Sequence, residues 1–169
     1  MRRWGRILFL GIVAVTRSDC FASPGPVTIA QTAAEANKAL VRTWIDQGFN
    51  RKDLTAVDRV FGSNFTVNGQ SIGPQELKQS MGRFHAAFPN LQVTITELIA
   101  EGDRVAMWYS AQGTHSGDFE GIHATGKPVR WVGADILRFA QGRIVEAQFV
   151  DDSRGLLLQL GATFASPQQ

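Results

Sequence analysis

The sequence predicts an α+β fold in which helices lie on one face of a bent antiparallel sheet. Two observations carry this prediction. Apolar residues recur at helical spacing in the segments between residues 32 and 88, and the pattern changes to alternation after Pro89. Short glycine-containing turns separate the alternating segments, which is typical of hairpins. We therefore expect helices first and then a run of antiparallel strands.

The helical part divides into three segments and a short strand. A capping box formed by Thr32 and Glu35 predicts the start of the first helix, and Gly48 predicts its end. A second short helix is expected after Asn50 and before Gly62. The segment FTVNG is expected to form a brief strand and turn, and Pro74 then starts a third helix that the residues PN terminate.

The remaining strands are expected to form hairpins at the turns EGD and AQG, and RGLLLQLG forms a short last helix. Apolar residues occur on both faces of these strands, so the second face is expected to line a cavity or to meet a partner subunit. This pattern favours a homodimer. The four predicted strands are LQVTITELI, RVAMWYSAQGTH, VRWVGADILRF and RIVEAQFVDD.

Residues 1–22 have the three parts of a secretory signal peptide: a basic start, an apolar run from Ile7 to Val15 and a polar end. That run is too short for a transmembrane helix, which needs about 20 residues. Cys20 and Ala22 predict cleavage after Ala22. We expect an exported protein, periplasmic or extracellular, with no membrane anchor after cleavage. A flexible lead-in (23–31), one domain (32–162) and a tail (163–169) would follow.

The charge balance argues against a nucleic-acid partner. Cleavage would remove four arginines and one aspartate, leaving 13 basic and 14 acidic side chains. A net charge near −1 provides no basic stripe for phosphates. The only cysteine, Cys20, would leave with the signal peptide. The mature domain is therefore expected to have no disulfide and no thiolate nucleophile.

Two carboxylates interrupt apolar stripes on the last two strands. Alternation places Asp135 on the face of Trp131 and Leu137, and Asp151 on the face of Phe149. Burial raises the pKa of a carboxyl group toward values useful for proton transfer. Asp135 is either a pocket acid or base or a core carboxylate bound to Arg or Tyr. Asp151 is either a second pocket group or an N-cap of the last helix.

The last hairpin sets the expected distance between these carboxylates. If the turn is centred on Gln141, Asp135 lies opposite Ala147 and Asp151 opposite Trp131. Four residues of strand would then separate the carboxylates, roughly 13 Å at ~3.3 Å per residue. We expect them not to act together as acid and base on one small bond.

The glycine-rich segment GTHSGDFEGIHATGKPV predicts a long connection that is either a lid or a surface excursion. His115 within it is a candidate general acid or base, and the alternative is a histidine that binds the loop backbone. The isolated histidines favour no metal site. The sequence also lacks a GxSxG elbow and nucleotide-binding glycine motifs, which argues against a serine hydrolase or a nucleotide enzyme.

The order and spacing of several segments resemble the SnoaL-like polyketide cyclase or ester cyclase family. The resemblance covers about residues 36–161. The segments are NKALVRTWIDQGFNRKDLTAVDRVF, GPQELKQSMGRFHAAFPNLQVTI, EGDRV, GTHSGDFEGIHATGKPV, ILRFAQGRIVE and GLLLQLG.

This resemblance implies a nuclear transport factor 2-like fold: a cone-shaped, curved antiparallel sheet with three packed helices around an apolar pocket, dimeric through the sheet. It also implies aldol ring closure of an aromatic polyketide ester by an acidic residue on the last strand, without metal or cofactor. The pocket is expected to include Trp44, Asn68, Trp108, Trp131 and Phe149.

The chain departs from the family pattern at the acidic residue. Where the family often has EHWD, this chain has EAQF, so Phe149 stands at the position of the catalytic aspartate. Asp135 stands where the preceding strand often carries a histidine. A carboxylate has therefore moved across the hairpin, or the cyclase activity is absent, and Asp151 is a second possible substitute. His115, by contrast, matches the family's GTH.

Three functions remain open from the sequence. The first is a cofactor-independent cyclase or isomerase that acts on a hydrophobic cyclic substrate through Asp135 with His115 nearby. The second is a non-catalytic binding protein for a small hydrophobic ligand. The third is a dimeric interaction module whose core is filled by Trp108, Trp131 and Phe149. An open pocket with Asp135 pointing inward would favour the first two.

Overall fold

A computed structural model describes residues 29–164. The predicted signal peptide, residues 23–28 of the lead-in and residues 165–169 of the tail lie outside the described residues. None of the helices within the described range is long and apolar enough to span a membrane. The elements are α1 (Ile29–Thr43), the π-helix η1 (Trp44–Asn50), α2 (Ala56–Val60), β1 (Phe61–Val67), β2 (Gln70–Ile72), α3 (Pro74–Ala87), β3 (Gln92–Glu101), β4 (Arg104–Thr114), β5 (Pro128–Ala140), β6 (Arg143–Asp151) and α4 (Ser153–Leu160).

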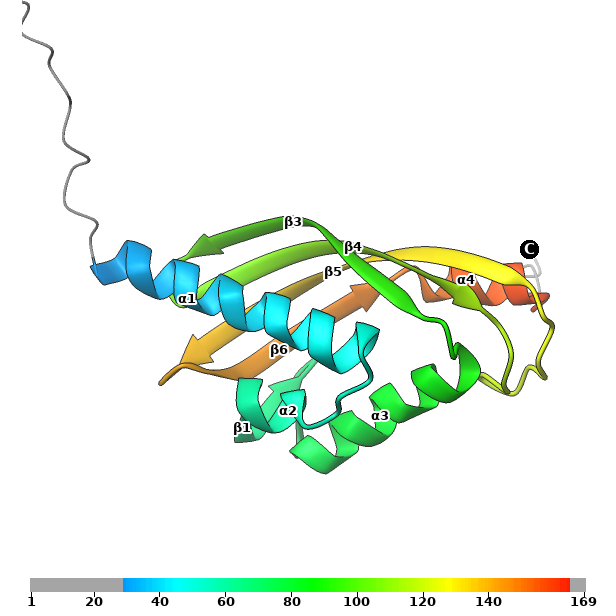
Figure 1. Ribbon diagram of the computed structural model, residues 1–169, viewed down its shortest axis with the longest axis horizontal. Coiled ribbons are helices and arrows are strands. Elements are labelled where there is room, and N and C mark those ends of the chain that lie inside the picture. The colour runs from blue at the N-terminus through cyan, green and yellow to red at the C-terminus, as the bar shows by residue number, and fades with distance from the viewer. Residues whose placement is uncertain (1–28, 165–169) are drawn as a thin grey trace, which may run out of the picture.

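The strands form one curved six-stranded sheet with the order β2-β1-β6-β5-β4-β3 (Figure 1). Neighbouring strands are antiparallel except β1 and β6, which are parallel. The long strands β3 to β6 are consecutive hairpins, as their alternating pattern predicts. The α+β class and the curved sheet predicted from the sequence are confirmed, and the parallel pair is a detail that the sequence pattern did not predict.

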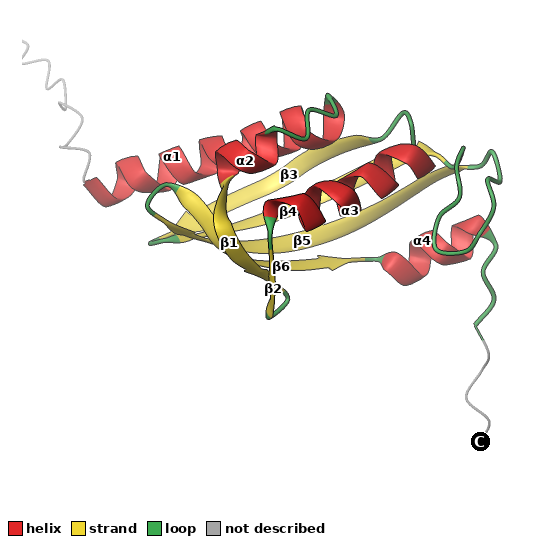
Figure 2. Ribbon diagram, turned by 90° about the horizontal axis from the view of Figure 1, so that it is seen from below, coloured by secondary structure: helices red, strands yellow, loops and turns green. Residues whose placement is uncertain are grey.

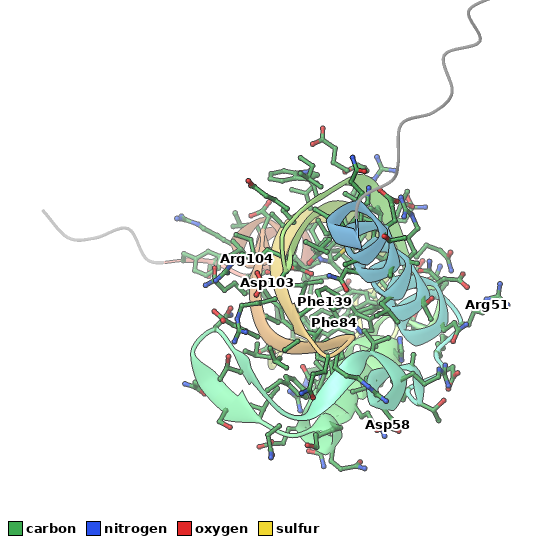
Figure 3. The ribbon with its side chains drawn as sticks, turned by 90° about the vertical axis from the view of Figure 1, so that its left-hand side faces the viewer. Arg51, Asp58, Phe84, Asp103, Arg104 and Phe139 are labelled. Carbon is green, nitrogen blue, oxygen red and sulfur yellow. The ribbon has the colours of Figure 1, made fainter. Side chains whose placement is uncertain are left out.

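The helices α1, α2 and α3 lie over the concave face of the sheet, and α4 lies near the C-terminus (Figure 2). The core lies between these helices and the sheet. Viewed toward one end of the molecule, Phe84 and Phe139 lie within this space, whereas Arg51 and Asp58 lie at the surface (Figure 3). Alternation along β5 places its inward side chains in this core and its outward side chains in solvent.

The first helix differs from its predicted bounds at both ends. Its bounds are Ile29–Thr43, so Thr32 and Glu35 lie inside the helix and not at its start, and Glu35 forms an ion pair with Lys38 (2.5 Å). The helical path also continues through Gly48 as η1. A Cβ at Gly48 would lie 2.9 Å from Met81 Cε. Close packing therefore explains this glycine, and the predicted helix end there is wrong.

The last hairpin also differs from its predicted register. Its turn consists of Gln141 and Gly142, which both have positive φ (52° and 71°), as a two-residue hairpin turn requires. A bulge at Val145 then shifts the pairing by one more residue. As a result, Asp135 lies opposite Phe149 and Asp151 lies opposite Gly133. The two aspartates are offset by two residues, about 7 Å along the strand, and the predicted 13 Å is wrong.

Candidate functional site

A cavity of about 110 Å³ lies between the concave face of the sheet and the helices η1 and α3. Its wall combines side chains from the middle of the sheet with aromatic and aliphatic side chains of the two helices. The lining residues are Trp44, Ile45, Phe49, Leu77, Ser80, Met81, Phe84, Leu91, Val93, Tyr109, Ala111, Trp131, Asp135, Phe149 and Asp151.

Two neighbouring rows of residues across β4, β5 and β6 contain the cavity's carboxyl groups and its phenol. One row contains Tyr109, Gly133 and Asp151, and the next contains Met107, Asp135 and Phe149. Asp135 is 4% exposed, whereas Asp151 is an exposed residue that still lines the cavity. The cavity therefore has its mouth near Asp151 and holds Asp135 deeper inside.

The environment of Asp135 favours its protonated form. Burial is the main cause and the negative charge of Asp151 is the second, and together they raise the pKa of Asp135 from 3.8 to about 8. A backbone hydrogen bond from Val150 offsets this increase only in part. The Oδ1 atom of Asp135 is buried and has no hydrogen-bond partner. One oxygen of the Asp135 carboxyl group thus has no hydrogen-bond partner, and the pKa of the group lies close to neutral pH.

Tyr109 is a site residue that sequence reasoning missed. A Cβ at position 133 would lie 2.3 Å from the Tyr109 hydroxyl, so Gly133 provides the space that the phenol occupies. Burial and the charges of Asp135 and Asp151 raise the pKa of Tyr109 well above its ordinary value, which keeps the phenol protonated. The alternation of β4, which places Tyr109 on the inner face with Val105 and Met107, was the available signal.

Aromatic rings form the remaining walls. Trp44 stacks on Phe149 with 5.6 Å between ring centroids, and Trp131 stacks on Phe84 at 6.4 Å. The Nε1 atom of Trp44 is buried without a hydrogen-bond partner. Trp44, Trp131 and Phe149 therefore lie where the sequence predicts pocket residues, and they leave a cavity between them.

Asp151 does not cap the last helix. Asp152 is the N-cap of α4, and its side chain accepts a hydrogen bond from the Gly155 backbone N–H (2.8 Å). The carboxylate of Asp151 instead accepts a hydrogen bond from the Ser153 hydroxyl and lines the cavity mouth. Of these two neighbouring carboxylates, Asp152 therefore caps α4, and Asp151 belongs to the cavity.

His115 lies outside the cavity wall. It is fully buried beside the ring of Phe88, and its Nδ1 accepts a hydrogen bond from the Thr125 backbone N–H (3.2 Å). Its own backbone N–H donates to the Lys127 carbonyl (2.9 Å). The structure thus places His115 at the base of the connection between β4 and β5, where it joins the two ends, and not with Asp135.

Two predicted pocket residues also lie elsewhere. Trp108 is 50% exposed on the outer face of β4, because its neighbours Met107 and Tyr109 take the inward positions. Asn68 does not line the cavity. Its side-chain amide donates to the Phe149 carbonyl (3.1 Å) and accepts from the Phe149 backbone N–H (2.9 Å). Asn68 therefore holds the backbone of a wall residue.

Among the described residues that line the cavity, the carboxylates are the only groups that commonly bind metals, since none of these residues is a histidine or cysteine. Among residues 29–164, no cluster of three or more His, Cys, Asp or Glu side chains could hold a metal ion. The arrangement therefore offers one buried carboxyl group, one carboxylate at the mouth and one phenol.

Comparison with known proteins decides the family. A family model described as SnoaL-like polyketide cyclase matches residues 39–160, which is most of the chain. The chain belongs to the SnoaL-like polyketide cyclase family. No curated protein matches the sequence.

Solved structures with the same fold include members of this SnoaL-like family. AclR from Streptomyces galilaeus, a proposed hydroxylase, is 31% identical with a TM-score of 0.68, and the match covers 76% of this chain and 97% of AclR. A proposed polyketide cyclase from Acidithiobacillus ferrooxidans is 25% identical with a TM-score of 0.68, over 74% of this chain and 94% of that one. IdmH from Streptomyces antibioticus, another proposed polyketide cyclase, is 25% identical with a TM-score of 0.66, over 75% and 99%. The nuclear transport factor 2-like fold expected from the sequence is therefore confirmed.

Proposed function

We propose that this SnoaL-like protein binds a small hydrophobic cyclic molecule in the cavity and catalyses proton transfer to or from it, as in enolisation or aldol ring closure, without a cofactor. The observation that carries the proposal is Asp135, a buried carboxyl group with a free oxygen in an otherwise apolar cavity. Proteins with this fold include a proposed hydroxylase and a proposed polyketide cyclase, so the fold alone does not determine the reaction.

Asp135 has the acidity that proton transfer needs. A general acid or base works best when its pKa lies near the working pH, and the pKa of Asp135 is raised to about 8. At neutral pH most molecules hold a protonated Asp135, and the ionised minority can remove a proton from a carbon next to a carbonyl group. The protonated phenol of Tyr109, one strand away, is a suitable donor for the oxygen that becomes negative.

The position of Asp135 supports a carboxylate that has moved across the hairpin. The family resemblance places the catalytic aspartate at position 149, where this chain has phenylalanine. Asp135 is the direct cross-strand partner of Phe149, and side chains at such positions have Cβ atoms about 5 Å apart. A carboxyl group on β5 therefore serves the same region of the cavity as one on β6.

The test is exchange of α-hydrogens into D₂O for small cyclic ketones such as cyclohexanone, followed by proton NMR. We expect the protein to accelerate exchange, with a rate that rises with pH and levels off above about pH 8. Asp135→Asn should reduce the acceleration about 100-fold or more, since general base catalysis contributes at least that much. Glu97→Gln, which removes a carboxylate from an exposed position on β3, is the matched control.

Absence of exchange above the buffer rate, or exchange that Asp135→Asn leaves unchanged, would overturn the catalytic proposal. If the ketones bind without exchange, the protein is a non-catalytic binding protein for hydrophobic ligands, which is the second function left open by the sequence. The third function required a filled core, and the cavity argues against it.

We further propose that the outer sheet face joins two copies of the chain. The large apolar side chains exposed on this face come from four consecutive strands, and single exposed apolar residues would need no such explanation. Light scattering should show a dimer, and Trp108→Arg should shift it toward monomer. An unchanged mass would contradict this interface. The residues are Ile99, Trp108, Val132, Ile136 and Val150.

Export after cleavage near Ala22 is likewise a proposal, and it rests on the sequence alone. N-terminal sequencing of protein recovered from the periplasm or medium of an expressing bacterium tests it. We expect a mature N-terminus at Ser23. A product that stays in the cytoplasm with its leader intact would contradict export.

A further inference from the structure

In the described part of the chain, the ionisable carboxyl groups of the cavity wall have no cationic side chain beside them in that wall. Within residues 29–164, the 15 residues that line the cavity include two with carboxyl groups, Asp135 and Asp151, and no lysine, arginine or histidine. Ser80 from α3 and Tyr109 from β4 supply the remaining hydroxyl groups. Anionic ligands would therefore meet repulsion and find no cation to bind them.

Aromatic rings form a large part of the same wall. Six of the lining side chains are aromatic, and they come from both sides of the cavity: the helices η1 and α3 on one side, and the strands β4, β5 and β6 on the other. The faces of such rings attract cations within about 6 Å, most strongly when water is excluded. The six are Trp44, Phe49, Phe84, Tyr109, Trp131 and Phe149.

We propose that the ligand of this cavity carries a positive charge, so that the site takes a small organic cation such as an ammonium compound. The inference rests on the proposed use of this cavity and names the chemical class of its ligand. The ammonium group would lie beside Asp135, between the aromatic rings, with Asp151 at the mouth. A volume of about 110 Å³ suits a compact cationic group better than an extended chain.

A cation would compensate the buried charge of an ionised Asp135. The Oδ1 atom of Asp135 is buried with no hydrogen-bond partner, and an unpaired carboxylate at such a position is unfavourable. An adjacent ammonium group compensates that charge, whereas a neutral ligand does not. The carboxylate at the mouth also attracts cations from solution before they enter.

Binding of a cation is therefore expected to depend on pH through Asp135. The groups that face Asp135 are Tyr109 from β4 and Asp151 from β6, and the helices contribute no charged group to the cavity wall. A bound cation favours the ionised form of Asp135, so it lowers the pKa of Asp135 and releases a proton. Affinity should rise about tenfold per pH unit below the pKa of Asp135 and level off above it.

Choline and its neutral isostere 3,3-dimethylbutan-1-ol provide the test, because they have the same shape and choline stays charged at every pH. Titration calorimetry at pH 6 and pH 9 should show choline binding up to about 100-fold more tightly at pH 9, as expected for a single ionisation near pH 8. The neutral isostere should bind at least tenfold more weakly than choline at pH 9, the factor that ~1.4 kcal/mol of charge-dependent attraction gives. Equal or tighter binding of the neutral compound at pH 9 would overturn the inference.

Variants connect the effect to this cavity. Asp135→Asn should remove the pH dependence of choline binding and leave the weak binding of the neutral compound unchanged. Asp151→Asn, at an exposed position where loss of the fold is not expected, should weaken choline binding at pH 9. Glu97→Gln removes one negative charge outside the cavity and should change neither affinity. Choline binding that responds to Glu97→Gln as strongly as to Asp151→Asn would show a general charge effect and contradict the site.

The outcome is separable from that of the proton-transfer proposal. If cyclohexanone exchanges its α-hydrogens and choline does not bind, the reaction stands and the cationic ligand class is wrong. If choline binds with the expected pH dependence and no ketone exchanges, the cation site stands and the proposed reaction is wrong.

Discussion

The concave face of the sheet changes from a packed apolar core to a cavity with polar groups over a few residues. At one end, Val105, Leu137 and Ala147 form a row across β4, β5 and β6, and none of the three has exposed surface. The next rows toward the mouth contain Asp135 and then Gly133 with Asp151 at the matching positions. The same strands, with the same inward alternation, thus form a packed core at one end and a polar cavity at the other.

This difference shows how little is needed to create a site within a core. The pairing register does not shift between the rows, and the side chains on successive inward positions differ. Where Leu137 fills space, Asp135 introduces a polar group without a partner on Oδ1, and Gly133 leaves room for the phenol of Tyr109. The packed row fills the core, and the cavity rows carry the polar groups of the wall.

Leu137→Ala should have the largest effect on stability. Because Leu137 is fully buried in the packed row, its truncation leaves a void and should lower the free energy of unfolding by about 2–5 kcal/mol. Denaturant unfolding of both proteins measures the difference. Leu158→Ala is the matched control, since its side chain is 51% exposed on α4, outside the proposed dimer interface. A similar loss for both variants would contradict the contrast between the packed inner row and an exposed position.

Asp135→Asn should change how stability depends on pH. The folded protein binds the Asp135 proton more tightly than the unfolded chain, because the pKa is raised from 3.8 to about 8. This stabilising preference is complete below about pH 4 and is lost as the pH rises toward 8. As the pH rises through this window, ionisation of Asp135 should therefore lower the free energy of unfolding by up to ~1.4 kcal/mol per pH unit.

The variant lacks this contribution, so its stability relative to the parent should rise by up to ~3 kcal/mol between pH 5 and pH 7. Unfolding of both proteins at each pH measures the difference, from which the other titrating groups cancel. Glu97→Gln should show no such trend. A difference that stays constant with pH would mean that Asp135 ionises normally in the folded protein.

The fold was predictable because alternation and turn signals act locally. Each long strand was predicted in its place, and alternation correctly placed Asp135 and Trp131 on the inner face. The error in the last hairpin arose from two shifts of one residue each: the turn lies at Gln141 and Gly142, and Val145 forms a bulge that no residue pattern marks. Together these shifts change the partners of both aspartates, so a correct face assignment still gave a wrong distance between them.

The site was only partly predictable because it depends on contacts between distant segments. Trp108 was expected in the pocket from the family resemblance, although the alternation of its own strand places it outside. His115 and Asn68 have the right polarity for a site, but His115 binds the loop backbone and Asn68 binds the backbone of β6. Alternation places Tyr109 on the inner face, but its contact with Gly133 on the neighbouring strand, which puts the phenol beside the two carboxyl groups, depends on the strand pairing and was missed.

Gly133→Ala offers the sharpest test of the cavity rows. The added methyl group would lie 2.3 Å from the Tyr109 hydroxyl and 2.4 Å from Cζ, so the whole phenol has to move. Such overpacking in a core costs about 1–3 kcal/mol, and denaturant unfolding should show a loss in that range. The displaced ring should also reduce ligand binding in the cavity.

A second substitution distinguishes this clash from a backbone effect. Because Gly133 does not have positive φ, alanine is compatible with its backbone, and only the phenol stands in the way. In a Tyr109→Ala background, Gly133→Ala should therefore cost much less than in the parent protein, with a coupling energy of at least ~1 kcal/mol. If the stability losses of the two single variants add up in the double variant, Tyr109 does not occupy the space above Gly133. The phenol would then not lie beside Asp135 and Asp151.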